Sequence, residues 1–226
     1  KMKIGFNKNP FSFSFTHKFP HIIDKKLHEV DRNLSLIEHL TDKSFQRPVL
    51  YPSAADYKKV APYQSSPYFC IAPASVWFTK QYPEEKWVEL IDRLHPDRRI
   101  YLLGAPGDME LCASIQKKTT HGDVQILAGE LSLLQSAALM EGEQMNYTND
   151  SAPLHIASAM NAPITAIFLS TIPEFGFGPL SDNSHIVETK EKLSCRPCGL
   201  HGKKACPEGH FKCAYTIDVN QFFESD

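Results

Sequence analysis

Hydrophobic positions from residue 68 onward alternate between short continuous runs and longer amphipathic stretches. A continuous apolar run of about four to eight residues is typical of a strand buried on both faces, whereas apolar residues spaced three and four apart indicate a helix. The pattern predicts strands at residues 68–72, 99–103, 124–127, 146–148 and 164–169. Between them it predicts helices at residues 84–94, 108–118, 132–141 and 153–160.

Strands and helices that alternate in this way predict an α/β fold. Because the strands are apolar on both faces, the pattern indicates a parallel sheet with helices on each side, which is a Rossmann-like domain. In such sheets ligands bind beyond the carboxyl ends of the strands, next to the N-termini of helices. The functional site is therefore expected in the loops that follow the strands.

The first sixty residues follow a different pattern. Residues 3–6 predict a strand and residues 24–40 an amphipathic helix, while residues 11–21 are aromatic and irregular. One strand and one helix cannot close a core of their own. The segment at residues 53–67, rich in Pro, Ser and Tyr, is expected to be a linker. The expected division is residues 1–60 as the C-terminal remnant of another domain with its linker, and residues 61–226 as one complete domain.

Composition and charge narrow the function classes. The chain has 226 residues, and its 42% hydrophobic content is that of a folded globular protein. Lys and Arg total 24 against 26 Asp and Glu, so no overall field attracts nucleic acid or an anionic surface, and any anion site is local. The apolar runs are far shorter than the ~20 residues that cross a bilayer. The chain opens on Lys1 and runs at once into strand-like residues, so we expect it to be part of a longer protein.

The loop at residues 72–80 is the first candidate anion site. Ser75 and Thr79 supply hydroxyl groups and Lys80 an ammonium, close to a helix that begins near Pro83. Such an arrangement holds phosphate oxygens without a metal. The loop lacks the glycine-rich cradle of a P-loop, and a solvated loop with a chance Thr-Lys pair is the alternative.

The second candidate follows the strand at residues 146–148. Ser151 is placed to cap the next helix, so the backbone N–H groups of Ser151 and Ala152 would point at an anion. Pro153 at the first turn removes an amide that has no helical partner. The alternative is an ordinary capped helix, with His155 a satisfied histidine on its inner face.

A third candidate is a cysteine-rich segment at residues 195–213. Its cysteines have the spacing C-x2-C-x7-C-x6-C and are Cys195, Cys198, Cys206 and Cys213. Four thiolates could bind zinc tetrahedrally, as in modules that dock a protein or nucleic acid. The second half is not a C-x2-C knuckle, so two local disulfides or free thiols remain alternatives.

A loop at residues 171–180, punctuated by Gly and Pro, could contact a ligand or be shaped only by its turns.

Taken in order, these segments resemble glycosyltransferase family 9, the ADP-heptose:lipopolysaccharide heptosyltransferases. The pattern P-x-S-x-W-x-T-K-x-x-P-x-x-x-W occupies residues 73–87, and N-D-S-x-x-x-H occupies residues 149–155. The loop at residues 170–179 and the Cys-Pro-rich tail also fit the family. The similarity runs in register over nearly the whole chain.

The resemblance implies a GT-B architecture, in which two Rossmann-like domains face a cleft. The donor is expected to be ADP-L-glycero-β-D-manno-heptose, bound on the C-terminal domain, and the acceptor a lipopolysaccharide inner-core sugar on the N-terminal one. Transfer would invert the anomeric centre without a metal ion or other cofactor. The enzyme would work at the cytoplasmic face of the inner membrane of a Gram-negative bacterium, with peripheral membrane contact and no nucleic acid partner.

The resemblance also implies roles on the nucleotide side of the donor site. Lys80, with Thr79 and Ser75, would neutralise the diphosphate as it leaves, which stabilises the charge that develops in the transition state. An acid in the loop after the second strand, Asp108 or Glu110, would bind the adenosine ribose.

On the sugar side, the resemblance implies that Asp150 binds heptose hydroxyls. The Ser151 and Ala152 amides would hold phosphate, supported by His155. The family's general base is an Asp in the first strand-to-helix loop of the N-terminal domain, which would lie upstream of Lys1. The chain is therefore expected to bind donor or ADP without transferring sugar. A nucleotide-sugar epimerase or a non-catalytic nucleotide-binding module on the same fold is the alternative.

Overall fold

A computed structural model of the protein describes residues 1–23, 27–42, 44–142 and 144–224. Contacts divide the chain into two compact units. The smaller unit is Lys1–Pro48 with Pro173–Gly178, and the larger unit is Val49–Ile172 with Pro179–Asp226. The chain thus passes between the two units three times.

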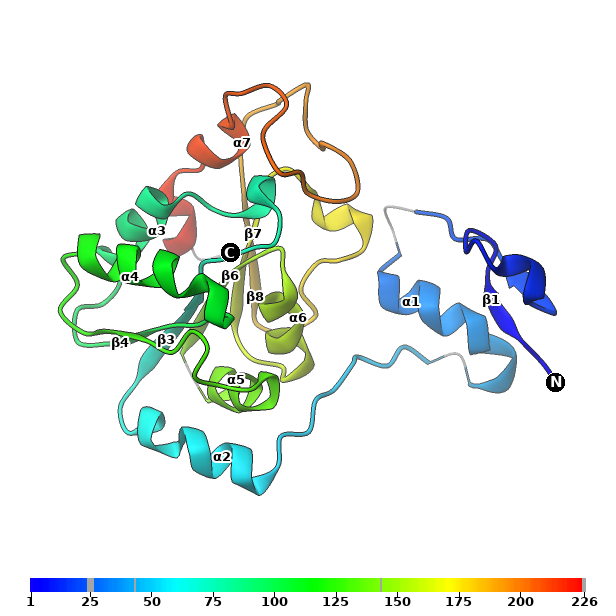
Figure 1. The fold of residues 1–226 in the computed structure, drawn as a ribbon, viewed down its shortest axis with the longest axis horizontal. Coiled ribbons are helices and arrows are strands. Elements are labelled where there is room, and N and C mark those ends of the chain that lie inside the picture. The colour runs from blue at the N-terminus through cyan, green and yellow to red at the C-terminus, as the bar shows by residue number, and fades with distance from the viewer. Residues whose placement is uncertain (24–26, 43, 143, 225–226) are drawn as a thin grey trace. The chain divides into compact units, whose positions relative to one another are not determined.

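The larger unit is built on a six-stranded parallel sheet (Figure 1). The strands are β3 (Tyr68–Ala72), β4 (Arg99–Leu102), β5 (Val124–Ile126), β6 (Met145–Asn149), β7 (Ile164–Phe168) and β8 (Ser184–Glu188). Their order is β5-β4-β3-β6-β7-β8, and every neighbouring pair is parallel. The predicted α/β fold with a parallel sheet is therefore confirmed.

β8 is the strand that the sequence pattern did not predict. It pairs with β7 at the edge of the sheet, with Ala166 opposite Ile186. Only Val187 among its residues is buried. Because one buried side chain leaves no apolar run, the hydrophobic pattern here is too weak to indicate a strand.

Helices cover both faces of this sheet. They are α2 (Ala54–Val60), α3 (Glu84–Ile91), α4 (Met109–Lys118), α5 (Leu133–Glu141), α6 (Ala152–Ala159) and α7 (Lys212–Tyr215). One buried cluster joins Phe69 and Ile71 of β3 to side chains of α3, α4 and α7. A second cluster joins Cys70 and Ala72 of the same strand to α2, α5 and α6. Alternate residues of a strand point to opposite faces, so a strand apolar throughout requires helices on both sides.

The segment expected to be a linker contains a helix instead. Ser53 caps α2, with its hydroxyl accepting a hydrogen bond from the Asp56 amide and the Asp56 carboxylate accepting from the Ser53 amide. Val60 at the end of the helix is fully buried in the same cluster as α5. This capping box and one buried residue stabilise a helix that is too short for a clear hydrophobic pattern.

The smaller unit contains a two-stranded parallel sheet of β1 (Ile4–Phe6) and β2 (His17–Phe19). β1 agrees with the predicted strand, whereas β2 lies in the stretch expected to be irregular. A single helical turn, Ser12–Ser14, connects the two strands. β2 has no buried residue, so its sequence carries no hydrophobic alternation that would have predicted it.

The long helix expected at residues 24–40 is shorter in the structure. α1 spans Glu29–Leu34 and continues as a 3-10 helix over Ser35–Leu40. His28 caps it at the N-terminus. The first residues of the predicted helix, 24–26, lie outside the described residues.

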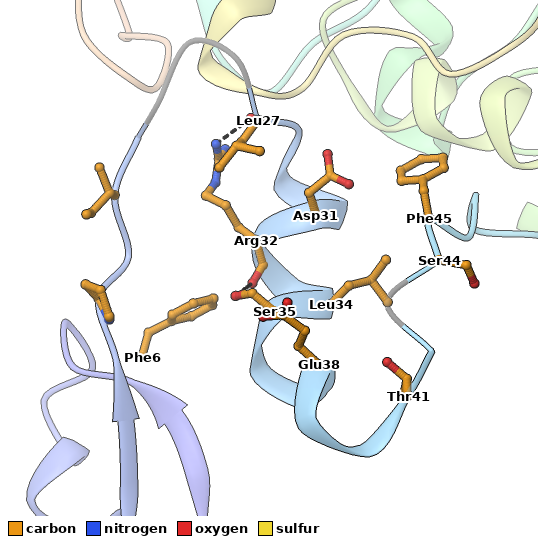
Figure 2. A pocket seen from close by; sticks show the side chains of 12 residues that line it. Phe6, Leu27, Asp31, Arg32, Leu34, Ser35, Glu38, Thr41, Ser44 and Phe45 are labelled. Atoms are coloured by element: carbon orange, nitrogen blue, oxygen red, sulfur yellow. Dashed lines mark hydrogen bonds between the residues drawn. The ribbon is translucent and has the colours of Figure 1, made fainter.

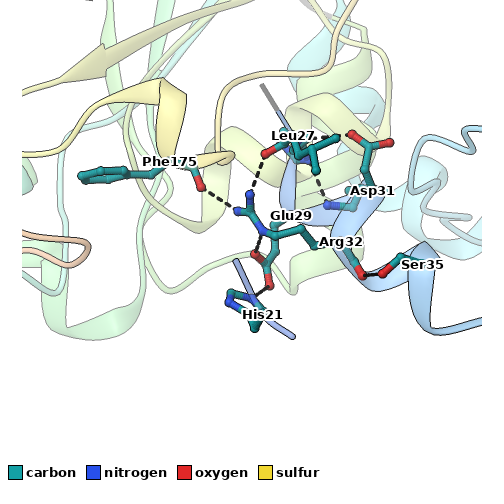
Figure 3. A network of polar contacts seen from close by, with 9 residues as sticks. His21, Leu27, Glu29, Asp31, Arg32, Ser35 and Phe175 are labelled. Atoms are coloured by element: carbon teal, nitrogen blue, oxygen red, sulfur yellow. Dashed lines mark hydrogen bonds and ion pairs between the residues drawn. The ribbon is translucent and has the colours of Figure 1, made fainter. Parts of the chain in front are cut away.

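Arg32 holds the smaller unit together through a network of polar contacts (Figure 3). Its side chain is buried and donates to the Leu27 carbonyl and the Phe175 carbonyl, each at 2.6 Å. Its Nε donates to Glu29 Oε2 at 2.7 Å, and Glu29 also contacts His21 at 3.1 Å. Phe175 lies in the loop Pro173–Gly178, so one guanidinium fixes that loop against α1.

A cavity of about 380 Å³ lies beside Arg32 within the smaller unit (Figure 2). Apolar and polar side chains line it together, among them Phe6, Leu34, Phe45 and Glu38. The unit also exposes large apolar side chains, which include Phe11 and Phe13.

His28 makes the smaller unit sensitive to pH. Its Nδ1 accepts a hydrogen bond from the Val30 amide, and its Nε2 contacts the Gly178 carbonyl, both at 3.1 Å. A carbonyl only accepts, so Nε2 carries the proton and the ring is neutral when it makes both bonds. Burial lowers the pKa of His28 below its usual value. Protonating Nδ1 would remove the acceptor that caps α1.

Acidification is therefore expected to loosen the start of α1. Because the pKa of His28 is lower in the folded state, its stabilising contribution is complete above about pH 6.5, the unfolded value, and is lost as the pH falls below it. Hydrogen-exchange protection of the Val30 amide, measured by NMR, should fall between pH 7.5 and pH 5. His28→Asn keeps an N-cap acceptor that does not titrate, so its protection should change less over this range. Equal pH dependence in both proteins would contradict the assignment.

Candidate functional site

The larger unit changes winding direction between β3 and β6. From β3 the chain builds outward through β4 to β5, and then returns to place β6 on the other side of β3. The connections that leave the carboxyl ends of these two paired strands run to opposite sides of the sheet at such a switch point, which is where open α/β sheets bind ligands. The loops after β3 and β6 are therefore the best placed for a functional site.

Asn149 ties these two loops together. It is fully buried, its Oδ1 accepts from the Tyr82 amide at 2.9 Å, and its Nδ2 donates to the Pro73 carbonyl at 2.9 Å. Both Pro73 and Tyr82 belong to the segment that connects β3 to α3. A side-chain amide has the donor and acceptor needed to hold two backbone groups at once.

A cavity of about 610 Å³ lies at this edge of the sheet. Its lining comes from the loops after β3, β4 and β5, from α5 and from the start of α6. The lining includes Ala74, Ser75, Leu103, Gly104, Asp108, Gly129, Leu131, Ser132, Ser136, Met140, Ser151, Ala152, Pro153 and Ile156. Its volume lies within the usual range for small-molecule sites, and its wall is mostly apolar with a few polar groups.

The loop after β5 was not expected to contribute, although it supplies part of the wall. Gly129 adopts a positive φ of 78°, and a Cβ atom there would lie 3.1 Å from Pro106 Cα. Glycine thus allows the loops after β4 and β5 to meet. The capping box of Ser132 and Gln135 at the start of α5 is the sequence signal that could have indicated this wall.

Lys80 and Asp150 form an ion pair; neither side chain lines the cavity, and Asp150 directly precedes Ser151, which does. Lys80 Nζ lies 2.7 Å from Asp150 Oδ2, and the two side chains are only 16% and 7% exposed. Thr171 Oγ1 donates to the same carboxylate oxygen at 2.7 Å. Two residues that the sequence placed in separate candidate sites are thus in direct contact.

Thr79 is turned into the protein. Its side chain is buried, and its Oγ1 accepts from the Lys203 amide at 2.8 Å and lies 3.0 Å from Ser170 Oγ. The Thr79 amide donates to the Lys203 carbonyl at 3.1 Å. The hydroxyl therefore joins the Lys80 loop to two other segments, and its expected contact with a ligand remains a prediction.

The N-terminus of α6 borders the cavity. Ser151 occupies the N-cap position, but its side chain makes no capping hydrogen bond. Within the described part of the chain, the Ser151 and Ala152 amides donate to no backbone acceptor, and Pro153 has no amide to donate. Both N–H groups can therefore serve a ligand. His155 is exposed one turn further along and does not line the cavity.

The two acids proposed for the ribose differ in position. Asp108 lines the cavity, and its Oδ2 accepts from the Ala105 amide at 2.7 Å. Glu110 is exposed on α4 and is not part of the lining. The structure thus brings Asp108 to the same cavity as Ser75, Ser151 and Ala152 and leaves Glu110 outside it.

The cysteine-rich segment gives no support for zinc. Among residues the structure describes, no group of three or more His, Cys, Asp or Glu is arranged to hold a metal ion. The thiols of Cys195, Cys198, Cys206 and Cys213 are not in disulfides. Cys213 is buried in the main core cluster, where burial raises the pKa of its thiol to about 11.

The chain therefore contains a Rossmann-like α/β domain with a cavity at its switch point. The family description "Glycosyltransferase family 9 (heptosyltransferase)" matches residues 1–209. The chain belongs to glycosyltransferase family 9.

In the part of the chain that the structure describes, no helix has the length and apolar content to cross a membrane.

Two curated relatives illustrate the similarity. Lipooligosaccharide heptosyltransferase 2 of Campylobacter jejuni is 23% identical over 99% of this chain and 67% of its own length. Lipopolysaccharide heptosyltransferase 3 of Escherichia coli is 29% identical over 75% of this chain and 52% of its own length. The chain thus spans between about half and two thirds of the length of these two relatives.

Solved structures share the fold. A family 9 glycosyl transferase from Veillonella parvula superposes with a TM-score of 0.70 at 20% identity, over 81% of this chain and 56% of that one. E. coli ADP-heptose lps heptosyltransferase II gives 0.65 at 21% identity, over 84% and 69%. E. coli heptosyltransferase WaaC with ADP gives 0.59 at 25% identity, over 77% and 54%. The expected GT-B class of fold is confirmed by these neighbours.

Proposed function

We propose that the larger unit binds ADP-heptose and that the protein transfers heptose from it to the inner core of lipopolysaccharide. The transfer inverts the anomeric centre and needs no metal ion. The observation that carries this proposal is the cavity at the switch point, lined by the N-terminus of α6, together with the buried pair of Lys80 and Asp150, which directly precedes Ser151 of that lining in the chain. The solved relative with ADP supports the choice of nucleotide.

The diphosphate is assigned to the region between Lys80 and the start of α6. The Ser151 and Ala152 amides can bind phosphate oxygens, and the positive end of the helix favours the charge. Lys80 offsets the negative charge that grows on ADP as the glycosidic bond breaks, which lowers the barrier to transfer. Asp108 is the better candidate for the ribose hydroxyls, because it lines the cavity and Glu110 does not.

Asp150 is assigned to the sugar. Among the described residues, its side chain contacts Lys80 and Thr171, in each case through Oδ2. Oδ1 can therefore accept hydrogen bonds from heptose hydroxyls. The ion pair then has two functions, because it orients the ammonium toward the phosphates and the carboxylate toward the sugar.

The smaller unit is assigned to the acceptor domain of the family. Its segments at residues 3–6 and 28–30 are similar to the end of that domain. The general base of the family lies in a segment that has no counterpart among residues 1–226, so the chain is expected to bind donor without transferring sugar. An acceptor anchored in lipid places the full enzyme at the cytoplasmic face of the inner membrane.

Nucleotide binding and transfer test the proposal separately. The chain should bind ADP by titration calorimetry, and UDP more weakly, because the site is assigned to an adenosine diphosphate. With ADP-heptose and acceptor lipid it should form no extended lipid, as followed by mass spectrometry. Preference for UDP would favour the epimerase alternative, and extended lipid would refute the assignment of the base upstream of Lys1.

A further inference from the structure

Arg196, in the cysteine-rich segment, binds the backbone at the end of β7. Its Nε donates to the Leu169 carbonyl at 2.6 Å, and its Nη2 donates to the carbonyls of Phe168 at 3.3 Å and Thr171 at 3.0 Å. The same Nη2 contacts the Glu188 carboxylate at the end of β8. The side chain is 12% exposed. One guanidinium thus holds the ends of two neighbouring strands.

The backbone that Arg196 holds carries the partners of the proposed phosphate site. Thr171 Oγ1 donates to Asp150 Oδ2, which pairs with Lys80. The preceding residue, Ser170, places its hydroxyl 3.0 Å from Thr79 Oγ1, next to Lys80 in the chain. Arg196 is therefore linked to Asp150 through Thr171, and the backbone that it holds also carries Ser170, which contacts the neighbour of Lys80. Arg196 itself does not line the cavity.

The rest of the segment supports the same loops. The Cys198 amide donates to the Ser170 carbonyl at 2.8 Å, and the Lys203 amide donates to Thr79 Oγ1 at 2.8 Å. Gly202 lies so close to the Lys80 loop that a Cβ atom would be 2.3 Å from Trp77 Cβ and 2.8 Å from Lys80 Cγ. The cysteine-rich segment thus packs directly behind the residues assigned to the diphosphate.

An arginine suits this position for a physical reason. Leu169 and Thr171 follow Phe168, the last residue of β7 and of its pairing with β8, so their carbonyls need donors other than the neighbouring strand. A guanidinium has five N–H donors in a rigid planar arrangement. A lysine ammonium has its donors on one nitrogen at the end of a flexible side chain. Lysine can keep the positive charge near Glu188, but it cannot hold all these carbonyls in one geometry.

We propose that Arg196 is a positioning residue for the diphosphate site, acting through Thr171 and Ser170 on the Lys80–Asp150 pair. This inference rests on the proposed function. It assigns the cysteine-rich segment a role in holding the loop after β7. The Lys80 ammonium and the Asp150 carboxylate must both be held in position to bind one ligand, because small displacements weaken charge-assisted hydrogen bonds.

A double-mutant cycle on ADP affinity tests the inference. Calorimetry on the full chain should show ADP binding weakened about 5- to 10-fold by Arg196→Lys and by a similar factor by Thr171→Val, as expected for loss of a hydrogen bond that orients a charged group. Because both act on one contact, the double variant should bind ADP much more tightly than the product of the two factors predicts. Arg99→Lys is the control, since Arg99 pairs with Asp123 at the opposite end of the sheet strands, and its ADP affinity should equal that of the native chain.

The outcomes separate the inference from the proposed function. If the native chain binds no ADP, the proposed function fails and the inference fails with it. If the native chain binds ADP but Arg196→Lys binds equally well, or the two factors multiply independently, only the positioning role is refuted. Should Arg196→Lys fail to fold in a thermal unfolding assay, Glu188→Gln replaces it, because it removes the carboxylate partner of the same guanidinium. Its ADP affinity should fall about 2- to 3-fold, and an unchanged affinity would refute the role.

Discussion

Replacing Lys80 with methionine should weaken ADP binding about 10- to 100-fold, because a hydrogen bond to a charged group contributes roughly 1.5–3 kcal/mol. Methionine keeps the unbranched stem that packs beside Gly202 and removes the ammonium. The loss should appear in the dissociation constant measured by calorimetry. The effect should shrink at high salt, since screening weakens the charge interaction that the variant removes.

Lys118→Met is the matched control for this prediction. Lys118 is the last residue of α4, is exposed, and pairs with Glu84 on the surface. The same loss of charge there should leave ADP affinity within about twofold, because exposed pairs contribute little. If Lys80→Met and Lys118→Met bind ADP equally well, the assignment of Lys80 to the diphosphate is wrong.

Replacing Asp150 with asparagine should separate ADP binding from sugar binding. The native chain should bind ADP-heptose more tightly than ADP, because Asp150 accepts hydrogen bonds from the sugar. In Asp150→Asn this preference should fall about tenfold, whereas ADP affinity should fall less than in Lys80→Met, because the variant keeps the ammonium and removes only the carboxylate that orients it. Lys80→Met should therefore weaken ADP most, and Asp150→Asn should weaken ADP-heptose most.

Asp150→Asn should also lower the free energy of unfolding by about 3 kcal/mol, because it leaves a largely buried ammonium without its counter-charge. Chemical denaturation measures this loss, and Asp123→Asn is the control at an exposed pair with Arg99. A native unfolding free energy for Asp150→Asn would show that the pair does not stabilise the fold. An equal loss of ADP and ADP-heptose affinity in Asp150→Asn would contradict the division of roles between the two residues.

The sheet of the larger unit was predictable because its hydrophobic pattern is strong. The run at residues 164–169 contains almost only apolar residues, and β7 is buried at every position. β8 escaped prediction because only Val187 is buried, and α2 because it is short and mostly exposed. Local patterns indicate an element when burial is extensive, and they fail where one buried residue decides the structure.

The candidate site was predictable in its loops but not in its contacts. The loop at residues 72–80 and the start of α6 were expected because they follow strands and precede helices. The wall supplied by Gly129 after β5 was not expected, and neither was the inward direction of the Thr79 hydroxyl. Which side of a loop faces a ligand depends on partners that are distant in the sequence, such as Lys203.

The amino-acid sequence by itself indicates how strands and helices alternate along the chain and that the sheet is parallel. It also contains the family patterns and the acids and cations of the site. They depend on local spacing and burial, which a single stretch of chain encodes. Only the tertiary structure shows that Lys80 pairs with Asp150, and that Asp108 lines the cavity while Glu110 lies outside it. It alone also shows that Arg196 supports the loop after β7. These contacts form where the ends of parallel strands meet, and the strand order that brings them together is set by packing of the whole sheet.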